Sequence, residues 1–156
     1  MVTPLLQYKN PVSLLLFLVL VLSGSSVHRC CGIIPHINGL EYHFINQELN
    51  WHEAQQFCRE NYLDLATVTS LEEAGALNRE SYTGLAWIGL LIEPASLTST
   101  WRWTVTGDVL GDYQNWRTNV PNGATSCIST ASDGMWFDHA CSHPHAFLCF
   151  QGEICS

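Results

Sequence analysis

The stretch NWHEAQQFC, Asn50–Cys58, predicts a helix that carries a cysteine into the core. Asn50 can accept a hydrogen bond from a backbone N–H, and the Glu53 side chain can reach back to the Asn50 N–H, the reciprocal arrangement called a capping box. Residues three or four positions apart form one apolar face: Trp51, Ala54, Cys58 and Tyr62. We expect the helix to pack this face inward and to turn its polar face to water.

A second helix is predicted to begin at Ser70, because Glu73 again stands three positions later. Leu71, Ala74 and Leu77 form its apolar stripe, and we expect all three side chains to face the core. Both helices are amphipathic packing elements.

Segments typical of β-strands lie on both sides of the helices. Glu41–Ile45 alternates with the period of a half-buried strand. Downstream, Ala86–Ile92 is a continuous apolar run, Thr100–Gly107 alternates, and His145–Gln151 closes the domain. Gly107–Cys127 is rich in Gly, Asn, Asp and Thr and is predicted to be a loop. Early helices and later strands indicate an α+β fold with an antiparallel sheet.

The first 26 residues resemble a secretory signal peptide. Lys9 precedes the apolar run Val12–Leu22, and the small residues Ser23–Ser26 follow it. The alternative is a retained signal anchor, but the run is shorter than the ~20 residues that span a bilayer. We therefore expect cleavage near Ser26, an extracellular secreted product and no membrane span after processing.

The mature chain of about 130 residues suits a single domain with one core. We divide it into a short N-terminal segment, residues 27–38, the folded domain, residues 39–151, and a C-terminal tail, residues 152–156. Neither an internal repeat nor a low-complexity linker argues for a second domain.

Cysteine and charge usage agree with export. The chain has 7 cysteines, too many for an ordinary cytosolic enzyme of this size, so they are predicted to form disulfides. Because the number is odd, at least one thiol stays free or pairs with another chain. The 14 acidic residues outnumber the 6 basic ones, and the basic residues are scattered, so we expect no nucleic-acid partner and no binding to anionic membranes.

Eight motifs in order connect the chain to a known family. They are NWHEAQQFC, LATVTSLEE, WIGL, WRW, NVPNG, SC, MWFDHAC and FLCF. In this order the sequence resembles the C-type lectin-like domain from Gly39 to about Gln151. The resemblance implies a disulfide-stapled double-loop fold, with two helices flanking small antiparallel sheets and a long loop that forms the ligand site.

The resemblance also implies a disulfide pattern, which the spacing of cysteines does not give. It pairs Cys58 with Cys149 and Cys127 with Cys141. Because the first and last strands of the fold lie side by side, we expect Cys155 to pair with Cys30 or Cys31. The remaining thiol of those two is predicted to form an interchain bridge, giving a disulfide-linked dimer, with a small-molecule cap as the alternative.

The calcium ligands of sugar-binding family members are largely replaced. Their loop reads Glu-Pro-Asn, then a second Glu, then Trp-Asn-Asp; the matching positions here are Val120, Pro121, Asn122, Thr125, Trp136, Phe137 and Asp138. Asn122 and Asp138 alone keep a ligand side chain at these positions. An auxiliary calcium position has Gly123 and Ser126. Because calcium takes about six to eight oxygens, including several carboxylates, we expect neither calcium nor another cofactor at this loop.

The resemblance nevertheless places a ligand site at the loop. Its candidate residues are Trp116, Asn119, Asn122, Thr125, Phe137 and Asp138. Phe137, where the family has a polar ligand, is either tucked under the loop or offered to a partner as an apolar anchor. Most other tryptophans match core positions. Without calcium, we expect the bond before Pro121 to be trans or a mixture of isomers.

Three histidines lie close together in DHACSHPH, next to Asp138: His139, His143 and His145. Such clusters can bind zinc or copper. Loop histidines are more often solvated, and Cys141 is assigned to a disulfide, so we expect no specific metal here.

The function that follows is carbohydrate binding by a secreted, calcium-independent lectin, with a carbohydrate or glycoprotein as partner. The alternatives are a protein-binding module and an ice-binding or structural protein. We find neither a Ser-His-Asp order nor zinc-hydrolase spacing, so catalysis is not expected.

Overall fold

The computed structural model describes residues 36–79, 81–92, 100–122 and 126–155, with the side chains of 36–40 and 153–155 left out. These residues belong to one compact unit, Gly32–Ser156. The predicted signal peptide, Cys30, Cys31 and Thr125 lie outside the described residues, as does the Cys155 side chain. In the part of the chain that is described, no helix is long and apolar enough to cross a membrane.

Helix α2 (Trp51–Asn61) confirms the predicted capping box. Asn50 Oδ1 accepts from the Glu53 N–H at 3.0 Å, and Glu53 Oε2 accepts from the Asn50 N–H at 3.2 Å. Three residues of the predicted face are buried: Trp51, Ala54 and Cys58. The indole N–H of Trp51 donates to the Ile88 carbonyl at 2.9 Å, which joins the helix to the sheet.

Helix α3 (Leu71–Ala76) begins after Ser70 as predicted, but one part of its predicted inner stripe is wrong. Ala74 and Leu77 pack on the core, whereas Leu71 is 76% exposed. The helix makes fewer than two turns, so the packing of its last residues fixes its rotation and leaves the first residue in water. The Glu73 carboxylate accepts from the Thr69 N–H at 2.6 Å.

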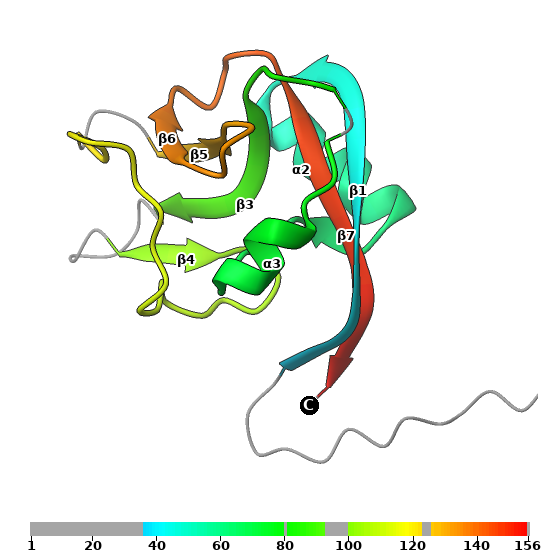
Figure 1. Ribbon diagram of the computed structural model, residues 1–156. Helices are drawn as coiled ribbons and strands as arrows, with labels where there is room; N and C mark the ends of the chain where they lie inside the picture. Colours follow the sequence, from blue (N-terminus) through cyan, green and yellow to red (C-terminus); the bar gives the residue numbers. More distant parts are fainter. Residues whose placement is uncertain (1–35, 80, 93–99, 123–125, 156) are drawn as a thin grey trace, which may run out of the picture. The chain divides into compact units, whose positions relative to one another are not determined.

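In the described residues, seven strands form one mixed sheet (Figure 1). Five of them follow the order β1-β7-β3-β5-β6, while β2 pairs with β7 and β4 pairs with β3. The strands are β1 (His36–Leu49), β2 (Asp64–Leu65), β3 (Ala86–Ile92), β4 (Trp101–Trp103), β5 (Cys127–Thr130), β6 (Trp136–His139) and β7 (His145–Cys155). The α+β class is confirmed. The expected small antiparallel sheets are instead one sheet, because β3 and β7 pair in parallel and join the two antiparallel groups.

The core lies on both faces of this sheet, since alternate residues of a strand point to opposite faces. Ala86 and Ile88 of β3 contribute to one buried cluster, on which Ala74 of α3 and Leu77, the residue that caps its C-terminus, also pack. Trp87 belongs to a second cluster with buried residues of α2. Figure 1 shows α2 and α3 on opposite sides of β7.

Both disulfides implied by the resemblance are present. Cys58 of α2 bonds to Cys149 of β7, and Cys127 of β5 bonds to Cys141. The first and last strands lie side by side as expected, because β1 and β7 pair antiparallel with His36 opposite Cys155. The pairing of Cys155 itself stays a prediction.

Candidate functional site

The long loop, residues 107–126, lies beside strand β6; residues 123–125 are outside the description. Backbone hydrogen bonds join the two: the Arg117 N–H donates to the Trp136 carbonyl at 3.1 Å, and the Trp136 N–H donates to the Asn115 carbonyl at 2.7 Å. The Asn115 side chain also donates to the Gly134 carbonyl at 2.8 Å. These hydrogen bonds therefore attach the middle of the loop to the sheet.

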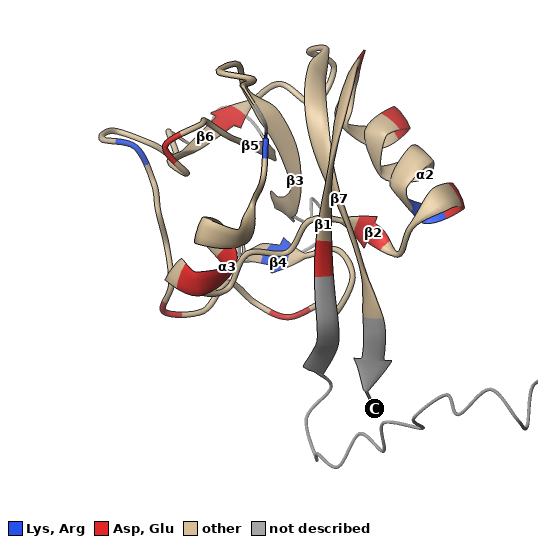
Figure 2. Cartoon of the chain, turned by 45° about the vertical axis from the view of Figure 1, so that its right-hand side comes forward, with Lys and Arg blue, Asp and Glu red and all other residues tan. Residues whose placement is uncertain are grey.

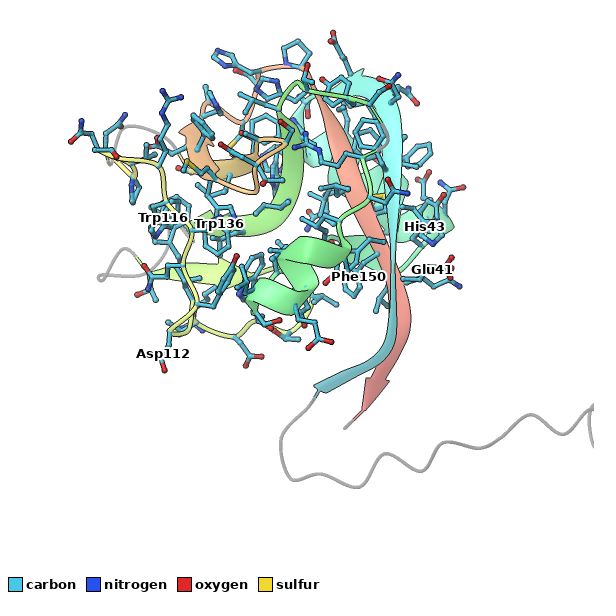
Figure 3. The ribbon with its side chains drawn as sticks, in the orientation of Figure 1. Glu41, His43, Asp112, Trp116, Trp136 and Phe150 are labelled. Atoms are coloured by element: carbon cyan, nitrogen blue, oxygen red, sulfur yellow. A yellow bond between two sulfur atoms is a disulfide. The ribbon has the colours of Figure 1, made fainter. Side chains whose placement is uncertain are left out.

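Trp116 supports this attachment with its ring. Its centroid lies 5.3 Å from that of Trp136 and 5.3 Å from that of Trp101, and Figure 3 shows Trp116 next to Trp136. Trp136 is buried, whereas Trp116 is half-buried, with its indole N–H donating to Gln114. Trp116 thus serves packing first, and part of its ring remains accessible.

A hydrogen bond between main chain and carboxylate holds the far end of the described loop. The Asn122 N–H donates to Asp138 Oδ2 at 2.9 Å. Just before it, Asn119 has a positive φ of 67°, a conformation that asparagine tolerates better than most residues. The Val120–Pro121 bond is cis, so our expectation of a trans or mixed bond was wrong.

Phe137 lies on the opposite face of β6 from Trp136 and Asp138, as strand alternation requires. The Arg117 guanidinium carbon is 5.1 Å from the centre of its ring, a cation–π contact. The ring of His139 stacks beside it with a centroid separation of 6.2 Å. Phe137 is half-buried, so it is partly covered by Arg117 and partly available.

The donor set at the calcium-type positions is poor in oxygen. Among the described ones, Val120 and Phe137 have hydrocarbon side chains, and one of the Asp138 oxygens accepts from the Asn122 N–H. Calcium needs about six to eight oxygens with compensating negative charge. These residues do not fit the ion.

The three histidines of the β6–β7 connection converge; His143 is exposed, and His139 and His145 are half-buried. One ring nitrogen from each of His139, His143 and His145 lies within 4.8 Å of the other two. Burial lowers the pKa of His145 to about 4, with further lowering by the other two rings. Burial also lowers the pKa of His139, and Asp138 opposes the shift. The sequence alone does not show that these side chains pack together.

Sequence reasoning missed Arg117. The pairing of the long loop with β6 brings Arg117 over Phe137. No sequence motif predicts such a contact. Figure 2 shows acidic residues on α2, α3 and β6 and few basic ones. Arg117 is thus one of a few positive charges, and it lies beside an aromatic ring.

The family can now be identified. The model of the family described as Lectin C-type domain matches residues 47–151, which include both helices, both disulfides and the long loop. The chain belongs to this family.

Individual C-type lectin relatives agree. Rat L-selectin is 30% identical over 81% of this chain and 38% of its own length. The cow carbohydrate-recognition domain of CD23, solved in the presence of an oligosaccharide, is 25% identical with a TM-score of 0.64, covering 80% of this chain and 98% of that one. A herring type II antifreeze protein is 25% identical with a TM-score of 0.63, covering 79% and 99%.

The chain spans less than half the length of the first curated C-type lectin relatives, 38%, 46% and 43%. The resemblance therefore concerns one domain of those proteins. What the complete relatives do is not transferred with it.

Proposed function

We propose that this chain is a secreted C-type lectin-like binding protein that recognises carbohydrate through its long loop, without calcium and without catalysis. The observation that carries the proposal is the hydrogen bond from the Asn122 N–H to Asp138 Oδ2, at 2.9 Å. In this hydrogen bond one of the remaining carboxylate oxygens holds the loop, a role that a bound metal could otherwise share.

Charge and ligand number argue against calcium. Val120 and Thr125 replace two glutamates and Phe137 replaces an asparagine, so three side-chain ligands and two negative charges are missing. The remaining carboxylate would have to offset the dehydration of a divalent ion largely alone. Contacts with β6 hold the described part of the loop, which supports a loop shape that does not depend on the ion.

The remaining groups suit a sugar. The exposed amides of Asn119 and Asn122 offer both donors and acceptors for hydroxyl groups. The partly accessible rings of Trp116 and Phe137 offer apolar faces to the C–H side of a pyranose. Because the two rings lie on different faces of β6, they belong to two adjoining contact areas, and Asn122 borders the one beside Asp138.

The experiment is a glycan array probed with metal-free protein, with and without added calcium. We expect the same glycans to bind under both conditions. Asn122→Ala should weaken binding at least tenfold, whereas Asp112→Asn, an exposed substitution earlier in the loop, should leave it unchanged. Binding that appears only with calcium, or an array without any bound glycan, would contradict the proposal.

A protein-binding function is the second candidate, favoured by the contact of Arg117 with Phe137. Arginine and aromatic residues are enriched at protein interfaces and their energetic centres. Capture of a single protein that free glycans fail to displace, and that Phe137→Ala releases, would favour this candidate over the lectin. An ice-binding function, suggested by the herring structure, would instead show as thermal hysteresis.

Secretion and dimerisation belong to the same proposal. Export with cleavage near Ser26 predicts a secreted product whose first residue follows that site, as N-terminal sequencing would show. An interchain bridge through Cys30 or Cys31 predicts a dimer on a non-reducing gel. A monomer with a titratable or capped thiol would remove the dimer from the proposal and leave sugar binding untouched.

A further inference from the structure

The connection between β6 and β7 places three imidazoles around one point. His139 is the last residue of β6, His145 is the first of β7, and His143 lies between them. The ring centroids of His139 and His145 are 5.1 Å apart, and that of His143 is 6.2 and 6.3 Å from the other two. The cluster is formed by side chains outside the long loop.

The backbone that carries the cluster is fixed at several points. The His143 N–H donates to the Ala140 carbonyl at 2.9 Å, which closes the turn. Cys141 within this turn is bonded to Cys127, and its carbonyl accepts from the Trp51 N–H at 2.9 Å. The Cα positions of the three histidines are thus set by a disulfide and two strands, so little order has to be imposed on binding.

Trp87 forms the floor of the cluster. It is fully buried, and its ring centroid lies 4.6 Å from that of His145 and 6.2 Å from that of His139. Its indole N–H donates to the Leu49 carbonyl at 3.0 Å, which holds the ring in place. The Nε2 atoms of His139 and His145 are buried and have no hydrogen-bond partner within the described residues. Buried nitrogens of this kind call for a partner.

We propose that His139, His143 and His145 bind one divalent late transition-metal ion, zinc in the first instance, with water at the fourth position. Zinc–imidazole bonds are about 2.0–2.1 Å long, which puts the nitrogens of a tetrahedral site roughly 3.3 Å apart. The ring nitrogens of the cluster lie within 4.8 Å of one another. Side-chain rotation, chiefly of the exposed His143, brings them to the separation that zinc requires.

Ligand chemistry decides which metal fits. Imidazole suits zinc, copper and nickel, whereas calcium takes oxygen ligands. Three histidines and an open position make a site that a water or an external ligand can complete. The long loop lacks oxygens for calcium and this connection holds nitrogens for zinc, so the two regions differ in the metal they can accept.

The test is calorimetric titration of the metal-free, full-length protein with zinc. We expect one ion per chain, at least tenfold weaker binding for His143→Gln, and a greater loss for His145→Gln. His52→Gln is the matched control, because His52 is exposed and lies outside the cluster, and it should bind as the unmodified protein does. Cobalt should give the visible absorption of a tetrahedral nitrogen site, and calcium should give no heat.

Folding of the variants does not limit the test. His143 is exposed, so His143→Gln keeps the fold and decides the matter even if His145→Gln does not fold. Zinc binding of unchanged strength in His143→Gln, an equal loss in His52→Gln, or no saturable binding would each overturn the proposal. Because sugar binding is measured separately on metal-free protein, failure here leaves the proposed function standing.

Discussion

Different interactions hold the two regions of the molecule, the sheet with its two helices and the long loop. The sheet and helices are held by two buried clusters and by the Cys58–Cys149 bond between α2 and β7. The long loop is held by a few backbone hydrogen bonds, by the packing of Trp116 and by the contact of Asn122 with Asp138. Substitutions in the loop therefore change what it binds while the core stays the same, which is how one fold serves several ligands.

The largest effect is expected from the disulfide of the core. Replacing Cys58 and Cys149 together by alanine removes a link across a separation of 91 residues, which lowers the unfolding free energy by about 4–5 kcal/mol in the chain-entropy account. Replacing Cys127 and Cys141, separated by 14 residues, costs about 3 kcal/mol. Urea denaturation of both variants measures the difference, and equal losses would break the ranking.

The histidine cluster makes stability depend on pH. His139 and His145 have pKa values lowered by burial, that of His145 to about 4, whereas an unfolded histidine titrates near 6.5. Between these values the unfolded chain binds more protons, so stability is full above pH ~6.5 and falls as the pH approaches 4. Metal-free protein should melt lower at pH 5 than at pH 7, and His145→Gln should melt with a smaller difference between the two. An unchanged difference would show that these rings are solvated.

A smaller effect is expected where the loop meets β6. Asp138→Ala removes the acceptor of the Asn122 N–H and should lower the unfolding free energy by about 1 kcal/mol. Asp138→Asn keeps an acceptor oxygen and should lose less. Weaker glycan binding with little change in melting temperature would show that Asp138 acts on the loop. A loss of unfolding free energy as large as that of a disulfide would show that it stabilises the core.

The backbone of the loop gives a similarly small stability change. Asn119 has φ 67°, so Asn119→Gly should be nearly neutral, whereas Asn119→Ala should cost about 1 kcal/mol because alanine disfavours this conformation. Thermal melting of the two variants tests this. Equal melting temperatures would show that the loop takes another conformation in solution.

The sequence predicted the parts of the molecule that depend on local pattern. The capping box of α2 and the strand Ala86–Ile92 are present as predicted, because caps and apolar runs act over a few residues. The buried stripe of α3 was wrong at Leu71, since the rotation of a short helix is set by what it packs against.

The candidate residues of the long loop followed from the resemblance, and their role in binding stays a prediction. The contact of Arg117 with Phe137 and the convergence of the histidines on Trp87 did not follow from it. Such contacts join residues distant in the chain, and their geometry is decided by strand pairing.

The central claim is that the long loop keeps its shape without calcium, and the melting temperature of metal-free protein tests it most directly. A ligand that binds the folded state raises stability by mass action, so calcium at millimolar concentration should leave the melting temperature unchanged. The triple variant Val120→Glu, Thr125→Glu and Phe137→Asn should gain a calcium-dependent rise. A rise in the unmodified protein that Asp138→Ala abolishes would contradict the account.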